Sequence, residues 1–407
     1  MAVTEQFSYR RAQLARQYCD ALEGKTILDA ASGLFLSAPR RTGKSTFMRE
    51  DLTPEMTSRG WEILYVDLWS DRLKDPAELI AAETARALAQ YDGSLMKAAR
   101  RAGLEKVRVA GTLTLDLGKI GKPGGITIAA ALEQLHARSA APIALLIDEA
   151  QHALSTDAGR NMLFALKAAR DQLNQGSAVR RLHLVMTGSN REKLAELLTG
   201  KASAFFGAHV TPFPLLEAEF VDAYTAWLNK QTIRGHHYSA TTLNRAFRLL
   251  GHMPELLKTV VGRAFADLGG AHALDELVNH HAEEIQTLMW QEYESAWNAL
   301  AAPQRVVIEV LARATPAPLP FSNDALLAYK RVAGMDLTPS HVQGALDALT
   351  AKGLLWRAGR GEYAFEDLRF RDWFLHTYPE LQSIPLVPKL RAKTPRPKPR
   401  TKARAKK

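Results

Sequence analysis

Residues 38–46 read Ala38-Pro39-Arg40-Arg41-Thr42-Gly43-Lys44-Ser45-Thr46, and they lie between an apolar run at residues 34–36 and a helix predicted from residue 44 to about residue 51. A glycine-bearing turn between a strand and a helix is typical of a phosphate-binding loop (P-loop), because several backbone N–H groups point inward at the N-terminus of the helix. The usual pattern begins with glycine, and the small Ala38 is a substitution that such loops tolerate. We therefore predict that residues 38–46 bind the phosphates of a nucleotide, with Lys44 on the β- and γ-phosphates and the Ser45 hydroxyl on Mg²⁺.

An apolar run that ends in two carboxylates supplies the other half of the predicted site. Residues 143–147 read Ile-Ala-Leu-Leu-Ile, and Asp148 and Glu149 follow directly. Five consecutive apolar residues indicate a buried parallel strand, and open α/β sheets bind their ligands at the carboxyl ends of such strands. A strand that merely ends in a solvated turn is the alternative, and the P-loop argues against it. We predict that Asp148 orients the water shell of Mg²⁺, while Glu149 and Lys44 are catalytic, with Glu149 polarising the attacking water.

A third strand is predicted at residues 182–186, and it ends in Thr187-Gly188-Ser189-Asn190. In P-loop ATPases that carry an additional strand, a polar residue at this point contacts the γ-phosphate. Thr187, Ser189 and Asn190 all fit that role, and their spacing does not choose among them. Ser189 or Asn190 equally fits the N-cap of a helix predicted over residues 191–198. Both interpretations stay open.

These three segments resemble the archaeal-type ATPases, which are relatives of the AAA+ and STAND branches and of the origin-recognition ATPases. Residues 61–69 are similar to the second strand of that family, and Gly251-His252-Met253-Pro254 is similar to its Gly-x-x-Pro turn, which opens a lid helix. The resemblance covers roughly residues 30–378. It implies an α/β fold with a parallel-sheet P-loop NTPase core of the AAA+ type, an all-helical lid and a C-terminal winged-helix domain. It also implies ATP as the nucleotide, since no guanine-specificity motif is present.

The sequence departs from the family pattern at one functional position. Such families often carry Gly-Arg, a candidate arginine finger, where this chain reads Phe205-Phe206-Gly207-Ala208. An arginine finger changes turnover by roughly 10³- to 10⁵-fold. Either hydrolysis is slow, or Arg191, Arg263 or a partner supplies the charge, and the sequence does not rank these alternatives.

The chain is predicted to comprise five parts: an N-terminal helix (residues 1–30), an ATPase core (31–215), a helical lid (216–300), a winged-helix domain (301–380) and a basic tail (381–407). Helical spacing predicts helices over residues 3–23, 76–91, 127–138 and 161–173, and an all-helical lid from residue 217 to about 288. Residues 107–128 alternate and carry glycines, which indicates a hairpin or a flexible excursion.

The predicted winged-helix domain shows few features of a sequence-specific DNA reader. Its third helix, over residues 341–352, contains no arginine, and only Gln343 along its body suits base recognition. The wing carries Arg357 and Arg360, which suit contacts with phosphates. We expect non-specific contact with nucleic acid, or an intramolecular lock over the nucleotide site.

The whole positive excess of the chain lies in its last residues. The formal net charge is +10, and residues 389–407 hold ten Lys or Arg and no acid. We expect a disordered tail that binds DNA or RNA non-specifically through its basic side chains. The candidates are Lys398, Arg400, Lys402 and Arg404. A solubilising tail, or one that binds another acidic surface such as membrane lipid, is the alternative.

Composition indicates an intracellular protein. Cys19 is the lone cysteine among 407 residues, which excludes a disulfide framework. Neither a signal-peptide pattern nor an apolar run long enough to span a membrane is present, so a cytoplasmic location is expected.

The pairs His236-His237 and His280-His281 lack a metal-ligand spacing with cysteines or carboxylates, and we interpret them as loop or surface histidines.

Two functions are predicted from the same site. The first is an ATP-binding and ATP-hydrolysing AAA+/STAND-type ATPase, with ATP and Mg²⁺ as cofactors, which couples its nucleotide state to assembly with a protein partner or with itself. The second is a DNA-dependent ATPase of the loader or transposition-regulator type, which binds duplex through its tail and wing. A protein that binds ATP as a switch without appreciable turnover is a third interpretation.

Overall fold

A computed structural model describes residues 6–27, 30–71, 73–91, 117–122, 124–177, 179–199, 203–231, 237–267, 273–314, 318–334, 337–359 and 361–379. Several predicted features lie outside the described residues: the basic tail with Lys398, Arg400, Lys402 and Arg404, the wing residue Arg360, and half of the excursion predicted at residues 107–128. No helix in the described ranges has the length and apolar character needed to cross a bilayer.

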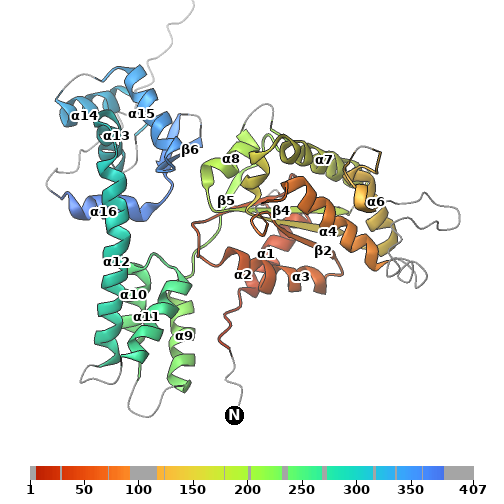
Figure 1. The fold of residues 1–407 in the computed structure, drawn as a ribbon, viewed down its shortest axis with the longest axis horizontal. Coiled ribbons are helices and arrows are strands. Elements are labelled where there is room, and N and C mark those ends of the chain that lie inside the picture. The colour runs from red at the N-terminus through yellow and green to blue at the C-terminus, as the bar shows by residue number, and fades with distance from the viewer. Residues whose placement is uncertain are drawn as a thin grey trace, which may run out of the picture.

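Five parallel strands form the central sheet (Figure 1). They are β1 (Leu34–Ser37), β2 (Glu62–Asp67), β3 (Ile143–Asp148), β4 (Leu182–Gly188) and β5 (Val210–Pro212), in the order β2-β3-β4-β1-β5. The strand β4 therefore lies between the P-loop strand and the acidic strand. Asp67 pairs in register with Asp148, and Leu36 with Thr187, so the polar ends of the strands meet at one edge of the sheet.

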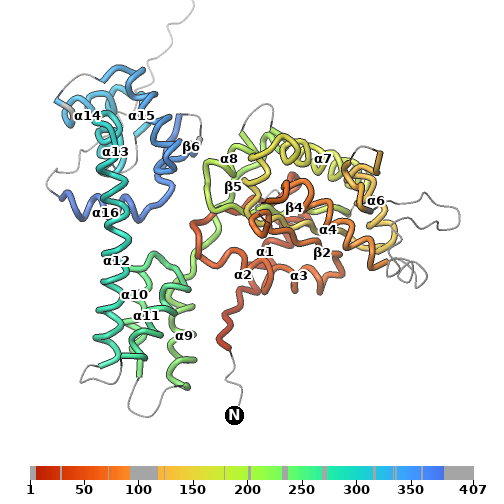
Figure 2. The backbone as a smooth tube through the Cα atoms, in the orientation of Figure 1, coloured from red at the N-terminus to blue at the C-terminus, as the bar shows by residue number. Residues whose placement is uncertain are grey.

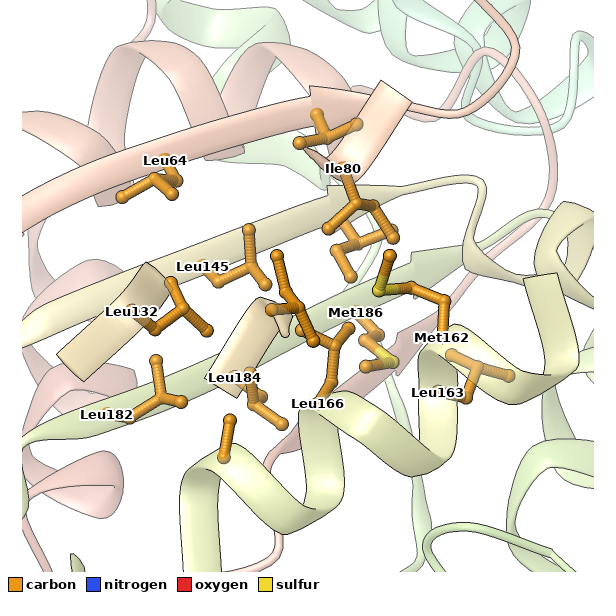
Figure 3. Packing of buried hydrophobic residues seen from close by; sticks show 14 of the residues in the cluster. Leu64, Ile80, Leu132, Leu145, Met162, Leu163, Leu166, Leu182, Leu184 and Met186 are labelled. Carbon is orange, nitrogen blue, oxygen red and sulfur yellow. The ribbon is translucent and has the colours of Figure 1, made fainter. Parts of the chain in front are cut away.

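Helices cover both faces of the sheet. One face is packed by α4 (Pro76–Gln90), α6 (Ile128–Ser139), α7 (Asp157–Asn174) and α8 (Arg191–Thr199), as Figure 3 shows in part. The other is packed by α1 (Ala12–Leu22), α2 (Lys44–Phe47) and α3 (Thr53–Ser58). Side chains of a strand alternate between its two faces, so Leu145 belongs to the first cluster and Leu146 to the second. This double burial explains why β3 reads as a continuous apolar run.

Several predicted helix boundaries are wrong. The helix after the P-loop does not end near residue 51, because a π-helical turn at Met48–Leu52 joins α2 to α3. This wider turn accommodates Pro54, which has no N–H for the regular ladder. The N-terminal helix starts at Ala12 rather than at residue 3. Residues before it are drawn away from a helix because the ring of Phe7 packs on α9 (Ala218–Gln231), with its centroid 4.9 Å from that of Tyr224.

The lid and the C-terminal unit share one helix. The lid comprises α9, α10 (Ala240–Leu249), α11 (Pro254–Ala266) and the first half of α12 (Leu274–Asn298). The winged-helix unit comprises α13 (Ala302–Arg313), α14 (Asn323–Ala333), α15 (Pro339–Ala351), β6 (Leu355–Gly359), β7 (Glu362–Phe365) and α16 (Leu368–Thr377). In α12, Val278 and Ile285 join the lid core, whereas Trp297 joins the core of the winged-helix unit.

The helix α12 is longer than the sequence predicted. It does not end near residue 288 but continues without a break to Asn298. Its 25 residues span about 37 Å. Figure 2 shows this helix running from the lid into the winged-helix unit.

Candidate nucleotide-binding site

A cleft of about 580 Å³ lies where the P-loop, the end of β3, the lid and the N-terminal segment meet. Its walls include residues 40–47 of the P-loop and Glu149. Tyr9, Leu216, Phe220 and Pro254 of the N-terminal segment and the lid also line it, together with the charged side chains of Glu255 and Lys258. We call the P-loop and Glu149 the charged end of the cleft, and the four side chains Tyr9, Leu216, Phe220 and Pro254 its apolar lining.

The P-loop is curled around its lysine. Gly43 has a φ of 92°, a backbone conformation that favours glycine, and it directly precedes α2. Lys44 Nζ donates hydrogen bonds to the carbonyl oxygens of Ala38 (2.6 Å) and Pro39 (2.9 Å), and Thr42 Oγ1 donates to the Pro39 carbonyl (2.7 Å). Burial lowers the pKa of Lys44, and the carboxylates of Glu149 and Asp148 oppose that shift. The ammonium group and both acids thus act on one another at the charged end.

Asp148 is a buried carboxylate with several donors. Its oxygens accept hydrogen bonds from the Tyr65 hydroxyl (2.9 Å), from the Glu149 backbone N–H (3.1 Å) and from the Thr187 hydroxyl. Burial and the neighbouring Asp148 raise the pKa of Tyr65, which keeps its hydroxyl protonated and able to donate. The sequence analysis did not identify Tyr65. Its place on β2, two residues before the end of that strand, is the signal that points to it.

Glu149 is held in an unusual backbone conformation. Its φ of 54° and ψ of 43° place it in the left-handed region, which costs a non-glycine residue roughly 1–3 kcal/mol and occurs mostly at functional sites. Glu149 Oε2 accepts hydrogen bonds from Ser189 Oγ (2.7 Å) and from Gln151 Nε2 (2.5 Å). Gln151 was also missed by the sequence analysis, although it lies only two residues after Glu149. These contacts fix the Glu149 carboxylate beside the P-loop.

The three polar residues predicted after β4 lie in three different environments. Thr187 contacts Asp148, and Ser189 contacts Glu149. Asn190 Oδ1 accepts a hydrogen bond from the backbone N–H of Lys193 (2.7 Å), as an N-cap of α8 does. Helix capping therefore falls on Asn190, Thr187 and Ser189 contact the two acids, and the predicted contact with the γ-phosphate stays a prediction.

The two arginines suggested as substitutes for an arginine finger lie elsewhere. Arg191 lies over the ring of Trp356 in the wing, 5.8 Å from its centroid. Arg263 is on α11, where its charge acts on Glu284. Within the part of the chain that the structure describes, neither lines the cleft, whereas Arg40, Arg41 and Lys258 do.

The winged-helix unit contacts the core at α8, as Figure 1 shows for β6. Glu366 accepts a hydrogen bond from the Arg191 backbone N–H (2.5 Å) and another from the backbone N–H of Glu192. In return, Glu192 accepts one from the backbone N–H of Arg357 (2.5 Å). A carboxylate at a helix N-terminus is stabilised by the unpaired N–H groups there. Glu366 thus caps α8 from the neighbouring unit.

The histidine pair at residues 280–281 differs from its prediction. His281 lies buried on α12, where its Nε2 is 2.8 Å from Asp267 Oδ2 and its Nδ1 is 3.1 Å from Glu284 Oε2. His280 Nε2 lies 3.3 Å from Glu284 Oε1. The prediction that carboxylate partners are lacking is therefore wrong, because Glu284 lies one helical turn away on the same face. The group ties α11 to α12, outside the cleft.

The sheet order and the strand-end chemistry define a class of fold. A parallel sheet in which β4 separates a P-loop strand from an acidic strand, followed by a helical lid and a winged-helix unit, is a P-loop NTPase fold of the AAA+ type.

Comparison with known proteins agrees with this class. No protein-family model and no curated protein sequence matches the chain. Among solved structures, the Walker-type ATPase PABY2304 of Pyrococcus abyssi matches with a TM-score of 0.51 and 16% identity, over 89% of this chain and 95% of that protein. The ORC2 protein of Aeropyrum pernix in its ADP form matches with a TM-score of 0.50 and 14% identity, over 84% of this chain and 85% of that one. At these identities the likeness establishes the fold.

Proposed function

We propose that this protein is a Mg²⁺-dependent ATPase whose nucleotide state controls the position of the winged-helix unit, and through it assembly with a protein partner or another copy of the chain. The observation that carries the proposal is the hydrogen bond between Ser189 and Glu149. It ties the carboxylate beside the P-loop to the strand end from which α8 begins, and α8 is the element that the winged-helix unit contacts.

The residues of the charged end have separate roles in hydrolysis. The P-loop N–H groups and Lys44 hold the phosphates. A water oxygen bonds to the γ-phosphorus as the bond to the β–γ bridging oxygen breaks, and the electron pair of that bond leaves with ADP. A proton of the water passes to Glu149, whose position is fixed by Ser189 and Gln151.

The apolar lining of the cleft suits an adenine base. Leu216, Phe220 and Pro254 from the lid and Phe7 and Tyr9 from the N-terminal segment line the cleft together. Tyr9 and Phe220 are in edge contact with each other, with ring centroids 5.5 Å apart. Flat apolar surfaces of this kind bind the face of a purine ring. The similar Aeropyrum pernix protein is described in its ADP form, which agrees with an adenine nucleotide here.

The donor set at the charged end fits Mg²⁺, a hard cation that prefers oxygen ligands. Ser45 lies in the first turn of α2, and the Asp148 carboxylate is oriented by Tyr65 and Thr187. These two residues would hold the ion. When bound, it neutralises charge on the β- and γ-phosphates.

Titration of the full chain with ATP, with and without Mg²⁺, tests the proposed activity. We expect saturable ATP binding that strengthens with Mg²⁺, and phosphate release that requires Mg²⁺. GTP should bind more weakly. A folded sample that takes up no adenine nucleotide in the presence of Mg²⁺ would overturn the proposal.

Coupling to the winged-helix unit is proposed to run through Glu366. Loss of its bonds to α8 in Glu366→Ala should weaken docking by roughly 1.5–3 kcal/mol, because hydrogen bonds to a charged group are lost. We expect a larger radius of gyration by small-angle scattering and a basal ATPase rate raised several-fold. Glu362→Ala, which removes an exposed carboxylate from β7 of the same wing, is the matched control. An unchanged radius of gyration and an unchanged ATPase rate in Glu366→Ala would mean that Glu366 does not hold the winged-helix unit on α8.

A DNA-dependent ATPase remains the second candidate. The exposed face of α15 includes Gln343, but its amide already donates to Asp347 (2.7 Å) on the same helix, which argues against base reading. Non-specific binding would then depend on the basic residues 389–407. If duplex DNA fails to raise the ATPase rate and removal of these residues leaves DNA binding unchanged, this candidate fails.

A further inference from the structure

The cleft contains two arginines on the P-loop itself, and their surroundings differ. Arg41 faces the lid, where its Nε lies 3.6 Å from Glu255 Oε2. Arg40 faces the other way. Its guanidinium lies over the ring of Trp69, 4.5 Å from the centroid, and its Nε donates to Ser189 Oγ at 3.4 Å. The Ser189 hydroxyl in turn donates to Glu149 Oε2 at 2.7 Å.

This chain of contacts locates the Arg40 guanidinium at the charged end of the cleft. It is separated by one hydroxyl group from the carboxylate assigned as the base. Its charge also acts on Lys44, where it contributes to the lowered pKa of that ammonium group after the larger effect of burial. A cation near both Lys44 and Glu149 would be within reach of the γ-phosphate of a nucleotide held by the P-loop.

Trp69 holds the Arg40 guanidinium in a fixed position by stacking. It lies two residues after the end of β2, and its own ring packs edge-on against His152, with centroids 4.2 Å apart. A guanidinium over a partly exposed aromatic face gains roughly 0.5–1 kcal/mol. Because the planar fork is already oriented, it loses less side-chain entropy than a free arginine when it binds phosphate oxygens.

We propose that Arg40 contacts the γ-phosphate of bound ATP and stabilises the charge that develops on it during hydrolysis, with Trp69 as its positioning residue. The inference rests on the proposed ATPase function. The chain then supplies in cis the positive charge that the segment Phe205-Phe206-Gly207-Ala208 lacks. Arg40 takes no proton in this step, since the proton of the attacking water goes to Glu149.

The test compares affinities for ATP and ADP with the turnover number in the full chain. In Arg40→Ala, ADP affinity should stay within about twofold, whereas ATP affinity should fall about tenfold and kcat by roughly 10³-fold, the lower range for a cis or trans arginine. Arg40→Lys should recover ATP affinity more than kcat, because an ammonium group lacks the bidentate fork. Trp69→Leu should lower kcat by a smaller factor and leave ADP affinity unchanged.

Two further variants separate the proposed role from a general effect of charge or stacking. Arg41→Ala removes a cation from the same loop and should weaken ATP and ADP alike. Arg305→Ala removes an arginine over Trp297, 5.6 Å from its centroid, in the winged-helix unit, and should change neither affinity.

Failure of this inference can be told from failure of the proposed function. If the unsubstituted protein binds no ATP, the proposed function fails. If it hydrolyses ATP while Arg40→Ala keeps the ATP-to-ADP affinity ratio and a kcat within threefold, the role of Arg40 alone is overturned. A kcat that rises in Arg40→Ala overturns it as well.

Discussion

Replacement of Glu149 by glutamine is expected to lower the kcat for ATP hydrolysis by roughly 10²- to 10⁴-fold, the usual contribution of a general base. Glutamine keeps the length of the side chain and retains an oxygen that accepts a bond from Ser189. It cannot take a proton from water. ATP affinity should therefore persist, and the protein should accumulate with ATP bound, as measured by single-turnover phosphate release and by the nucleotide content of the isolated protein.

Glu196→Gln is the control for that measurement. Glu196 lies on α8 outside the cleft, in an exposed ion pair with Arg160. Its replacement should leave kcat unchanged. Equal phosphate release from Glu149→Gln and the unsubstituted protein would mean that Glu149 is not the base.

Replacement of Lys44 by alanine is expected to weaken ATP binding by roughly 10- to 100-fold, because a charge-assisted hydrogen bond to phosphate contributes about 1.5–3 kcal/mol. The same change removes the donor for the carbonyl groups of Ala38 and Pro39, so the loop itself should become less stable. Calorimetric titration with ATP and ADP measures the first effect, and the temperature of thermal unfolding measures the second.

Lys167→Ala provides a comparison for Lys44→Ala. Lys167 on α7 forms an exposed ion pair with Asp171, and pairs of this kind contribute little to stability. If Lys44→Ala binds ATP as tightly as Lys167→Ala, the P-loop lysine does not hold the phosphates.

The P-loop and the acidic strand were predictable because each is a local pattern with its own chemistry. A glycine at the start of a helix and two acids after an apolar strand need no knowledge of distant contacts. The meeting of the polar strand ends also followed, since parallel strands bring their carboxyl ends to one edge. That Thr187 and Ser189 contact the two acids confirms this shared edge without the sequence having chosen between them.

The residues that surround Asp148 and Glu149 were harder to predict from the sequence. Tyr65 is 83 positions from Asp148 along the chain, and their contact depends on the pairing of β2 with β3. Arg40 and Trp69 meet only after the P-loop and the turn beyond β2 are both in place. Such contacts are set by strand register and rotamer, which a single sequence does not state.

The contact between Glu366 and α8 was even harder to predict from the sequence. The residues that it joins are 175 positions apart. Burial raises the pKa of Glu366, and the helix N-terminus and Arg191 oppose that shift. Nothing in the sequence around residue 366 distinguishes this carboxylate from a solvated one, because the N–H groups that it binds belong to another unit of the fold.

The unbroken course of α12 has a mechanical consequence. A continuous helix resists bending, so a tilt imposed at one end appears at the other as a sideways shift. For a length of about 37 Å, a tilt of about 10° moves the far end by about 6 Å. That displacement exceeds the reach of a hydrogen bond, so under the proposed coupling a small tilt of the lid over a nucleotide would separate Glu366 from α8, with α12 acting as a lever between the two units.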